Sequence, residues 1–120
     1  MRARSVYLWL KVVEATSIPL AILMSLYILS AYGLTLPELF GHLGFTYRTS
    51  QYVHTHPLLR YLTTIATALH TFGGVVILVR RYTRRNTLAL ITEIVVAGYL
   101  ILIVSLATVA ELYLILGGLR

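Results

Sequence analysis

Cysteine is absent from the 120 residues of this chain. Its absence excludes disulfide bonds, iron–sulfur clusters held by thiolates, and the covalent attachment of c-type haem. Charged residues are scarce as well, at 12% of the chain, and the sequence has neither a glycine-rich phosphate loop nor a Ser-His-Asp arrangement. Any cofactor must therefore be held by histidine, carboxylate or tyrosine side chains.

Hydrophobic residues make up 58% of the chain, and they come in unbroken runs rather than in amphipathic alternation. A helix rises about 1.5 Å per residue and the hydrocarbon core of a bilayer is roughly 30 Å thick, so one crossing needs about 20 apolar residues. Three segments reach this length, and we predict membrane-spanning helices over residues 12–34, 61–79 and 88–116. The expected fold is an all-α integral membrane protein, a single transmembrane domain with three helices in an up-down bundle.

The connection between the first two spans, residues 35–59, is the one sizeable segment outside the predicted helices. It carries several aromatic residues and the helix-breaking residues Pro37, Gly41, Gly44 and Pro57. We predict a long first loop, with a short interfacial helix over residues 36–43 and an irregular return to the second span.

Two histidines in this connection form a His-Thr-His sequence, which resembles the start of a metal site. Alternate residues of an extended segment point to opposite sides, and no third ligand is evident nearby. We therefore predict that His54 and His56 are an exposed loop pair and not a metal site.

Basic residues are distributed unevenly among the ends of the predicted spans. The larger group flanks the first span and fills the connection between the second and third: Arg2, Arg4, Lys11, Arg80, Arg81, Arg84 and Arg85. The smaller group consists of Arg48, Arg60 and Arg120. Three crossings bring the larger group to one side, so the positive-inside rule places the N-terminus of this multi-pass cell-membrane protein in the cytoplasm. Topology and contacts with anionic lipid headgroups then explain the net charge of +6, and no nucleic-acid partner is expected.

Three carboxylates lie within or beside the predicted spans. Glu14 follows Lys11 by one turn, which predicts a local ion pair. Glu93 and Glu111 are 18 residues apart, which is about five turns, so they share one face of the third span. We expect each of them to reach the interface or to pair with a neighbouring arginine.

His70 lies ten residues from each of the arginines that bound the second span, and so at the bilayer midplane. Its neighbours at i−4 and i+4 are Ala66 and Gly74, with Gly73 adjacent. A neutral imidazole can ligate haem iron, and small residues on the same face let the porphyrin plane approach the helix. The other interpretation is a small-residue packing face in which His70 bonds another helix.

The stretch over residues 68–74, Ala-Leu-His-Thr-Phe-Gly-Gly, continues to Arg81 and Tyr82. It resembles the cytochrome b membrane-anchor subunits of succinate dehydrogenase and fumarate reductase, specifically the smaller of the two anchors. That family has a histidine in the second helix, a glycine at +4 and a tyrosine at +12, and His70, Gly74 and Tyr82 match all three. The resemblance spans about residues 6–108 and includes the length and the three-helix topology.

Two departures from the family pattern concern the quinone site. The family has an aspartate before the tyrosine, where this chain has Arg81. In the larger anchor, a serine, a histidine and an arginine near the start of the first helix serve the quinone and the haem propionates. Ser17 matches that serine, whereas Ala21 stands in the place of the arginine. The larger partner is therefore expected to contribute those groups.

The resemblance implies a non-catalytic anchor that binds haem b and quinone and passes electrons from succinate, through an iron–sulfur subunit, to quinone. His70 would be an axial ligand of the haem iron, with clearance provided by Ala66, Gly73 and Gly74. Tyr82 would bond a quinone carbonyl, and Ser17 would belong to the quinone site. The partners would be a second membrane anchor subunit, which supplies the second axial ligand unless a second copy of this chain does, an iron–sulfur subunit and a flavoprotein subunit.

The four arginines between the second and third spans are candidates for propionate contacts or for docking the iron–sulfur subunit. Two functions of other classes compete with the anchor. One is a cofactor-free structural or accessory membrane subunit, in which the small-residue face only packs helices. The other is a small proton-coupled transporter, suggested by Glu14 and by chain length, but such transporters need four helices and residues 35–59 contain no apolar run for the fourth.

Overall fold

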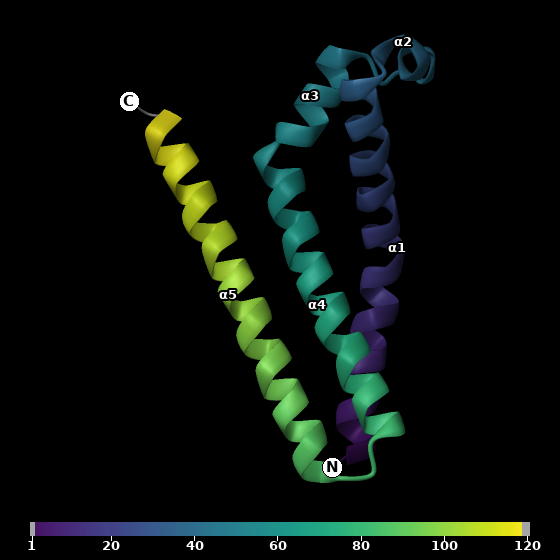
Figure 1. The fold of residues 1–120 in the computed structure, drawn as a ribbon, viewed down its shortest axis with the longest axis vertical. Coiled ribbons are helices and arrows are strands. Elements are labelled where there is room, and N and C mark those ends of the chain that lie inside the picture. The colour runs from purple at the N-terminus through teal and green to yellow at the C-terminus, as the bar shows by residue number, and fades with distance from the viewer. Residues whose placement is uncertain (1, 119–120) are drawn as a thin grey trace.

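The computed structural model describes residues 2–118, and every regular element in that range is a helix (Figure 1). Its three long helices are α1 Arg2–Thr35, α4 Pro57–Tyr82 and α5 Asn86–Gly118. Its short elements are α2 Pro37–Phe40, the 3₁₀ helix η1 Gly41–Leu43 and α3 Tyr47–Thr55. Each long helix is long and apolar enough to cross a membrane, which confirms the predicted all-helical class with three spans.

The long helices extend beyond the predicted spans, most of all at the start of α1. That helix begins ten residues before the predicted start at residue 12, because residues 2–11 include the basic residues Arg2, Arg4 and Lys11 but no helix breaker. At the start of α4, Pro57 occupies the first helical turn, where its missing N–H costs nothing. The apolar runs therefore predict the parts of these helices that are apolar enough to cross a membrane, and the helices themselves extend past both ends of those runs.

The prediction of a long first loop is wrong, because the segment between α1 and α4 is mostly helical. The helical conformation expected over residues 36–43 is present as α2 followed by η1, while the interfacial position of this segment stays a prediction. The irregular return is instead α3, whose N-cap Thr46 accepts a hydrogen bond from the backbone N–H of Thr49. Gly44 makes the turn between η1 and α3 with a φ of +88°, a conformation that favours glycine.

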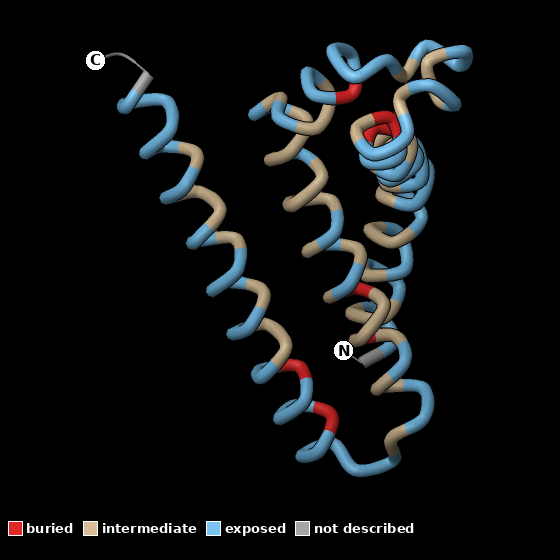
Figure 2. Tube along the Cα trace, turned by 45° about the horizontal axis from the view of Figure 1, so that its top comes forward, coloured by how far each residue is buried: buried red, intermediate tan, exposed pale blue. Residues whose placement is uncertain are grey.

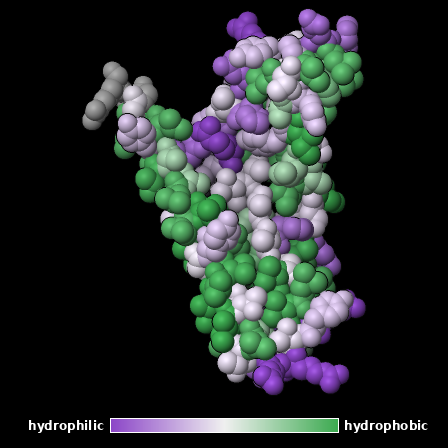
Figure 3. Space-filling model, in the orientation of Figure 1, coloured by the Kyte–Doolittle hydropathy of each residue, from purple (hydrophilic) through white to green (hydrophobic). Residues whose placement is uncertain are grey.

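The long helices are arranged with α4 between α1 and α5 (Figure 1). Helix α1 runs beside α4 over most of its length, whereas α5 leans away from α4 toward the C-terminal end. Few side chains are buried (Figure 2), and Val76 and Ala89 are the buried hydrophobic residues of the described chain. On the face drawn in Figure 3, hydrophobic side chains cover much of the long helices, while hydrophilic ones gather at the two ends and in the upper part of the space between α4 and α5. A largely apolar surface is expected for a bundle that faces lipid.

Glycines permit the closest approaches to α1. A Cβ atom added to Gly73 of α4 would lie 2.8 Å from Cγ2 of Val13 and 3.3 Å from the carbonyl oxygen of Trp9. Beside this contact, the ring of Trp9 meets that of Phe72 edge to face, with 4.7 Å between centroids. At the other end of α1, an added Cβ on Gly33 would lie 2.0 Å from Oγ of Ser50. Helix α1 is thus held against α4 at one end and against α3 at the other.

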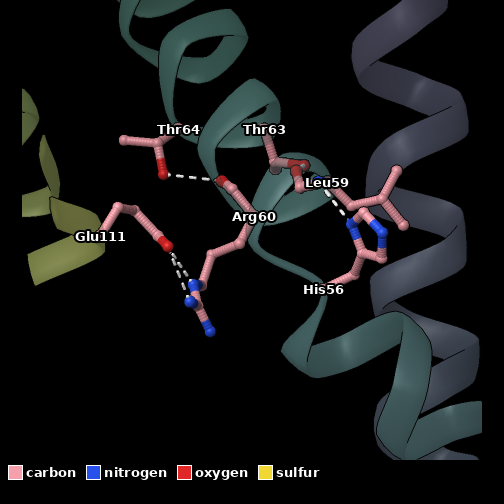
Figure 4. Close-up of polar contacts among 6 residues, drawn as sticks. All are labelled: His56, Leu59, Arg60, Thr63, Thr64 and Glu111. Carbon is pink, nitrogen blue, oxygen red and sulfur yellow. Dashed lines mark hydrogen bonds and ion pairs between the residues drawn. The ribbon is translucent and has the colours of Figure 1, made fainter. Parts of the chain in front are cut away.

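Two bidentate ion pairs hold α5 against α4. Arg60 donates to both carboxylate oxygens of Glu111, at 2.5 and 3.0 Å (Figure 4), and Arg80 donates to both oxygens of Glu93, at 2.7 and 2.9 Å. The expected pairing of these two glutamates with arginines is confirmed. The two pairs lie near opposite ends of α4. They fix the position of α5 along α4 and its rotation, because a bidentate contact tolerates little displacement.

The local pair on α1 is also confirmed, with Nζ of Lys11 2.8 Å from Oε2 of Glu14. The described members of the larger basic group lie at one end of the bundle, near the N-terminus and the α4–α5 connection (Figure 1). Helices α2 and α3 lie at the other end together with Arg48 and Arg60, while Arg120 lies outside the described residues.

Single cysteines should report the three crossings directly, since the chain has no native cysteine. We expect Arg84→Cys in the α4–α5 connection and Glu38→Cys in α2 to react with a membrane-impermeant maleimide from opposite sides of sealed vesicles. Both native side chains are exposed, and neither position has the positive φ that would strain a cysteine at Gly44. Labelling of both cysteines from the same side would contradict the three-span arrangement.

Candidate functional site

His70 lies near the middle of α4, on the side that faces α1. Its imidazole is half-buried, and its Nδ1 atom is 3.0 Å from Oγ1 of Thr16. Antiparallel packing of α1 and α4 brings the two side chains to the same level, although they are 54 residues apart in the sequence. The second interpretation in the sequence analysis, a hydrogen bond from His70 to another helix, is therefore present in the structure.

The hydrogen bonds of Thr16 are compatible with a proton on Nδ1 of His70. Its Oγ1 is 2.8 Å from the carbonyl oxygen of Val12 and 3.2 Å from that of Val13. A hydroxyl has one proton, and when Thr16 donates it to one of these α1 carbonyls, its oxygen accepts from Nδ1–H of His70, which is one of the two tautomers that the contact allows. This assignment leaves the lone pair on Nε2, for which no hydrogen-bond partner is found within residues 2–118.

A neutral imidazole held in this way has the form that metal-binding histidines take. In such sites one ring nitrogen donates a hydrogen bond that fixes the tautomer and the ring orientation, and the other nitrogen ligates the metal. The contact between Nδ1 of His70 and Oγ1 of Thr16 corresponds to the hydrogen bond that fixes the ring in such sites. With the proton on Nδ1, the lone pair of Nε2 is the one that can ligate a metal.

The small residues near His70 fall on two different faces of α4. A Cβ added to Gly74 would meet no atom within 4 Å, so this side of the imidazole is open. Ala66 lies one turn before His70 on the same stripe and is half-buried. Gly73 is turned toward α1, where Val13 and Trp9 occupy the space beside it. In the isolated chain Gly73 serves helix packing, while Ala66 and Gly74 border the open face.

An apolar cleft of about 370 Å³ separates α4 from α5 at mid-depth, with Ala68, Phe72 and Ala97 among its lining residues. His70 does not line this cleft, because it lies on the other side of α4, toward α1. The imidazole and the cleft are therefore separate features of the bundle.

The two residues predicted for the quinone site are not brought together. Tyr82 is the last residue of α4 and is 73% exposed, with the guanidinium carbon of Arg81 5.6 Å from its ring centroid. Ser17 is exposed on α1, and its Oγ donates to the carbonyl oxygen of Val13 at 2.6 Å. Because the neighbouring Thr16 is level with His70, Ser17 lies about 18 Å along the bundle from the level of Tyr82.

The prediction of an exposed loop pair is wrong for the two histidines near α3, since both are half-buried and hydrogen-bonded. Nδ1 of His54 is 3.1 Å from Oγ of the buried Ser30 of α1. His56 is the N-cap of α4 and accepts from the backbone N–H of Leu59 at 3.4 Å (Figure 4). No feature of the local sequence predicted that α3 would form and place His54 beside α1. Within the described chain, no group of three histidine or carboxylate side chains lies close enough to hold a metal ion.

The hydroxyl partners of the histidines are functional candidates that the sequence analysis missed. Thr16 and Ser30 are 14 residues apart, which is about four turns, so they lie near one face of α1. Each hydroxyl is within hydrogen-bond distance of an α1 carbonyl and of a histidine Nδ1. Their shared periodicity was visible in the sequence, but the rotation of α1 that presents them to the histidines was not.

Comparisons of the chain with protein-family models, with curated proteins and with solved structures find no match.

Proposed function

We propose that the protein is a haem b and quinone-binding membrane anchor, of the smaller type, in a succinate dehydrogenase-like complex. The observation that carries this proposal is the hydrogen bond between Nδ1 of His70 and Oγ1 of Thr16, because the tautomer that donates from Nδ1–H leaves Nε2 with its lone pair at mid-depth in the bundle. When bound, haem b supplies a one-electron carrier between an iron–sulfur subunit and quinone.

The residues around His70 fit one side of such a group. Gly74 leaves space that a larger side chain would fill, and Ala66 adds little bulk one turn away on the same stripe. The other histidines of the chain, His42, His54 and His56, lie in or beside the short elements at the end of the bundle. The second axial ligand is therefore assigned to a second membrane anchor subunit.

The proposed orientation places the N-terminus and the α4–α5 connection in the cytoplasm, by the positive-inside rule. The iron–sulfur and flavoprotein subunits would dock at this end, beside the exposed side chains of Arg81, Arg84 and Arg85. Arg80 is half-buried and already bonded to Glu93, so its first role is to hold α5.

Within this proposal the quinone site is assigned to Tyr82, because it is an exposed hydroxyl at the end where electrons arrive. Ser17 lies too far from Tyr82 along the bundle to share one quinone ring with it. It is therefore left out of the proposed site.

Replacement of Tyr82 by phenylalanine should lower quinone reduction about tenfold, because the lost hydroxyl would stabilise the reduced quinone oxygen. Succinate oxidation with an artificial acceptor, haem content and assembly should be unchanged. The matched control is Tyr113→Phe in α5, since Tyr113 is 77% exposed but lies near the opposite end of the bundle. Quinone reductase activity equal to that of the unmodified complex in Tyr82→Phe would remove Tyr82 from the site.

The cofactor-free structural subunit is the second candidate, and a specific observation favours it. The Thr16–His70 bond and the packing of Gly73 on Val13 hold α1 against α4 without any cofactor. The reduced-minus-oxidised absorption spectrum of the protein, purified with its partner subunits from haem-replete cells, separates the two functions. A reducible Soret and α band are expected for the anchor, and a spectrum without haem bands would establish the structural subunit instead.

A further inference from the structure

A crevice of about 650 Å³ opens at the basic end of the bundle, between the first turns of α1 and the first turns of α5. The end of α4 contributes Arg80 to its lining. The residues that define its chemistry are Arg4, Ser5 and Leu8 of α1 and Asn86 and Leu90 of α5.

Both walls of this crevice are polar at the end of the bundle and become apolar one turn deeper. On α1, Arg4 lies at the helix end and Leu8 follows it one turn deeper into the bundle. On α5, Asn86 is the first residue of the helix and Leu90 follows one turn deeper. The two leucines are 57% and 55% exposed, so they offer apolar surface that this chain does not cover. A ligand that matches both walls has a polar head at the membrane surface and an apolar chain below it.

The positive charge of the crevice favours a ligand with an anionic headgroup. Arg80 lies in a bidentate pair with Glu93, whereas Arg4 has no carboxylate partner in the described chain. Three further exposed arginines, Arg81, Arg84 and Arg85, lie at the same end. The carboxylates of this end, Glu14 and Glu93, are both already paired. Positive charge is therefore left without a partner inside the protein, and Ser5 and Asn86 add neutral hydrogen-bond donors.

We propose that this crevice binds one anionic phospholipid from the adjacent leaflet. Its phosphate would lie near Arg4, Ser5 and Asn86, and an acyl chain would run over Leu8 and Leu90. Basic pockets between transmembrane helices at one membrane surface are known to take such headgroups. An acidic segment of a soluble protein would match the arginines but would leave the two leucines in contact with polar groups. This inference does not depend on haem or quinone binding.

The test measures retention of dioleoylphosphatidylglycerol against dioleoylphosphatidylcholine by the full-length protein in native mass spectrometry. Wild-type protein should retain the anionic lipid preferentially. Removing the polar contacts with Arg4→Gln and Asn86→Leu together should lower that preference about fivefold to tenfold. The matched control Arg48→Gln removes one exposed arginine from the opposite end, and should leave the preference unchanged. Helix content and thermal unfolding in phosphatidylcholine vesicles should be the same for all variants.

A further variant distinguishes a lipid phosphate from a free phosphate. Leu8→Ser leaves the headgroup contacts in place and should lower retention of phosphatidylglycerol about threefold by removing apolar contact with the acyl chain. Displacement of the bound lipid by millimolar inorganic phosphate, with no effect of Leu8→Ser, would identify a free-phosphate site and overturn the proposal. Arg48→Gln and the double variant Arg4→Gln with Asn86→Leu could also lose the same amount of preference for phosphatidylglycerol. That result would show that general surface charge causes the preference, and it would overturn the proposal too.

Discussion

Replacement of His70 by alanine should abolish the haem absorption bands of the purified complex. Within the proposed function, this side chain is the imidazole of the chain that lies at mid-depth and carries its lone pair on Nε2. Alanine removes the ligand, and it also removes the hydrogen bond to Thr16, so assembly must be checked by co-purification of the partner subunits. Unchanged reduced and oxidised spectra in an intact His70→Ala complex would refute the ligand assignment.

Two variants separate the ligand from its support. Thr16→Val removes the acceptor of the Nδ1–H bond and should shift the haem potential and broaden the spectrum without removing the bands, because the ring loses a fixed orientation. Thr16→Ser keeps the hydroxyl and should restore both properties. The matched control is His54→Ala, which loses a similar bond to Ser30 at the other end of α1 and should leave the spectrum unchanged. A Thr16→Val spectrum and potential identical to those of the unmodified protein would show that the hydrogen bond only joins the two helices.

Replacement of Gly33 by alanine should destabilise the protein by about 3 kcal/mol, at the upper end of the usual cost of overpacking. The added Cβ would lie 2.0 Å from Oγ of Ser50, 3.0 Å from its Cβ and 2.8 Å from the carbonyl oxygen of Phe45. The Ser50 hydroxyl can rotate away, but the backbone oxygen cannot. Helix α1 must therefore separate from α3 and from the turn that precedes it.

The measurement is the midpoint of thermal or detergent-induced unfolding, followed by helix content. The matched control is Gly98→Ala in α5, where an added Cβ meets no atom within 4 Å. This control should be neutral or stabilised by up to about 1 kcal/mol, since alanine is the better helix former. The double variant Gly33→Ala with Ser50→Gly should recover part of the loss. Equal stability of Gly33→Ala and Gly98→Ala would contradict the close approach of α1 and α3.

The sequence by itself determined the parts of the fold that depend on local composition. An apolar run long enough to cross the hydrocarbon core must become a helix, because a backbone in lipid has to satisfy its own hydrogen bonds. The three spans follow from this requirement, and so does the pairing of Lys11 with Glu14, which lie one turn apart on the same helix. The gathering of the two basic segments at one end follows from the two crossings, α1 and α4, that lie between them. These properties need no knowledge of how the helices pack.

The tertiary structure decided everything that depends on how each helix is rotated and shifted against its neighbours. The spacing of Ala66, His70 and Gly74 places them on one stripe of α4. Only the packing of α4 on α1 determines that His70 contacts Thr16 and that Gly73 lies against α1. Packing also places Nδ1 of His54 within hydrogen-bond distance of Oγ of Ser30, because the segment expected to be a loop forms the helix α3. The physical reason is that helical periodicity defines faces within one helix, whereas the partner of each face depends on close packing between segments that are distant in the sequence.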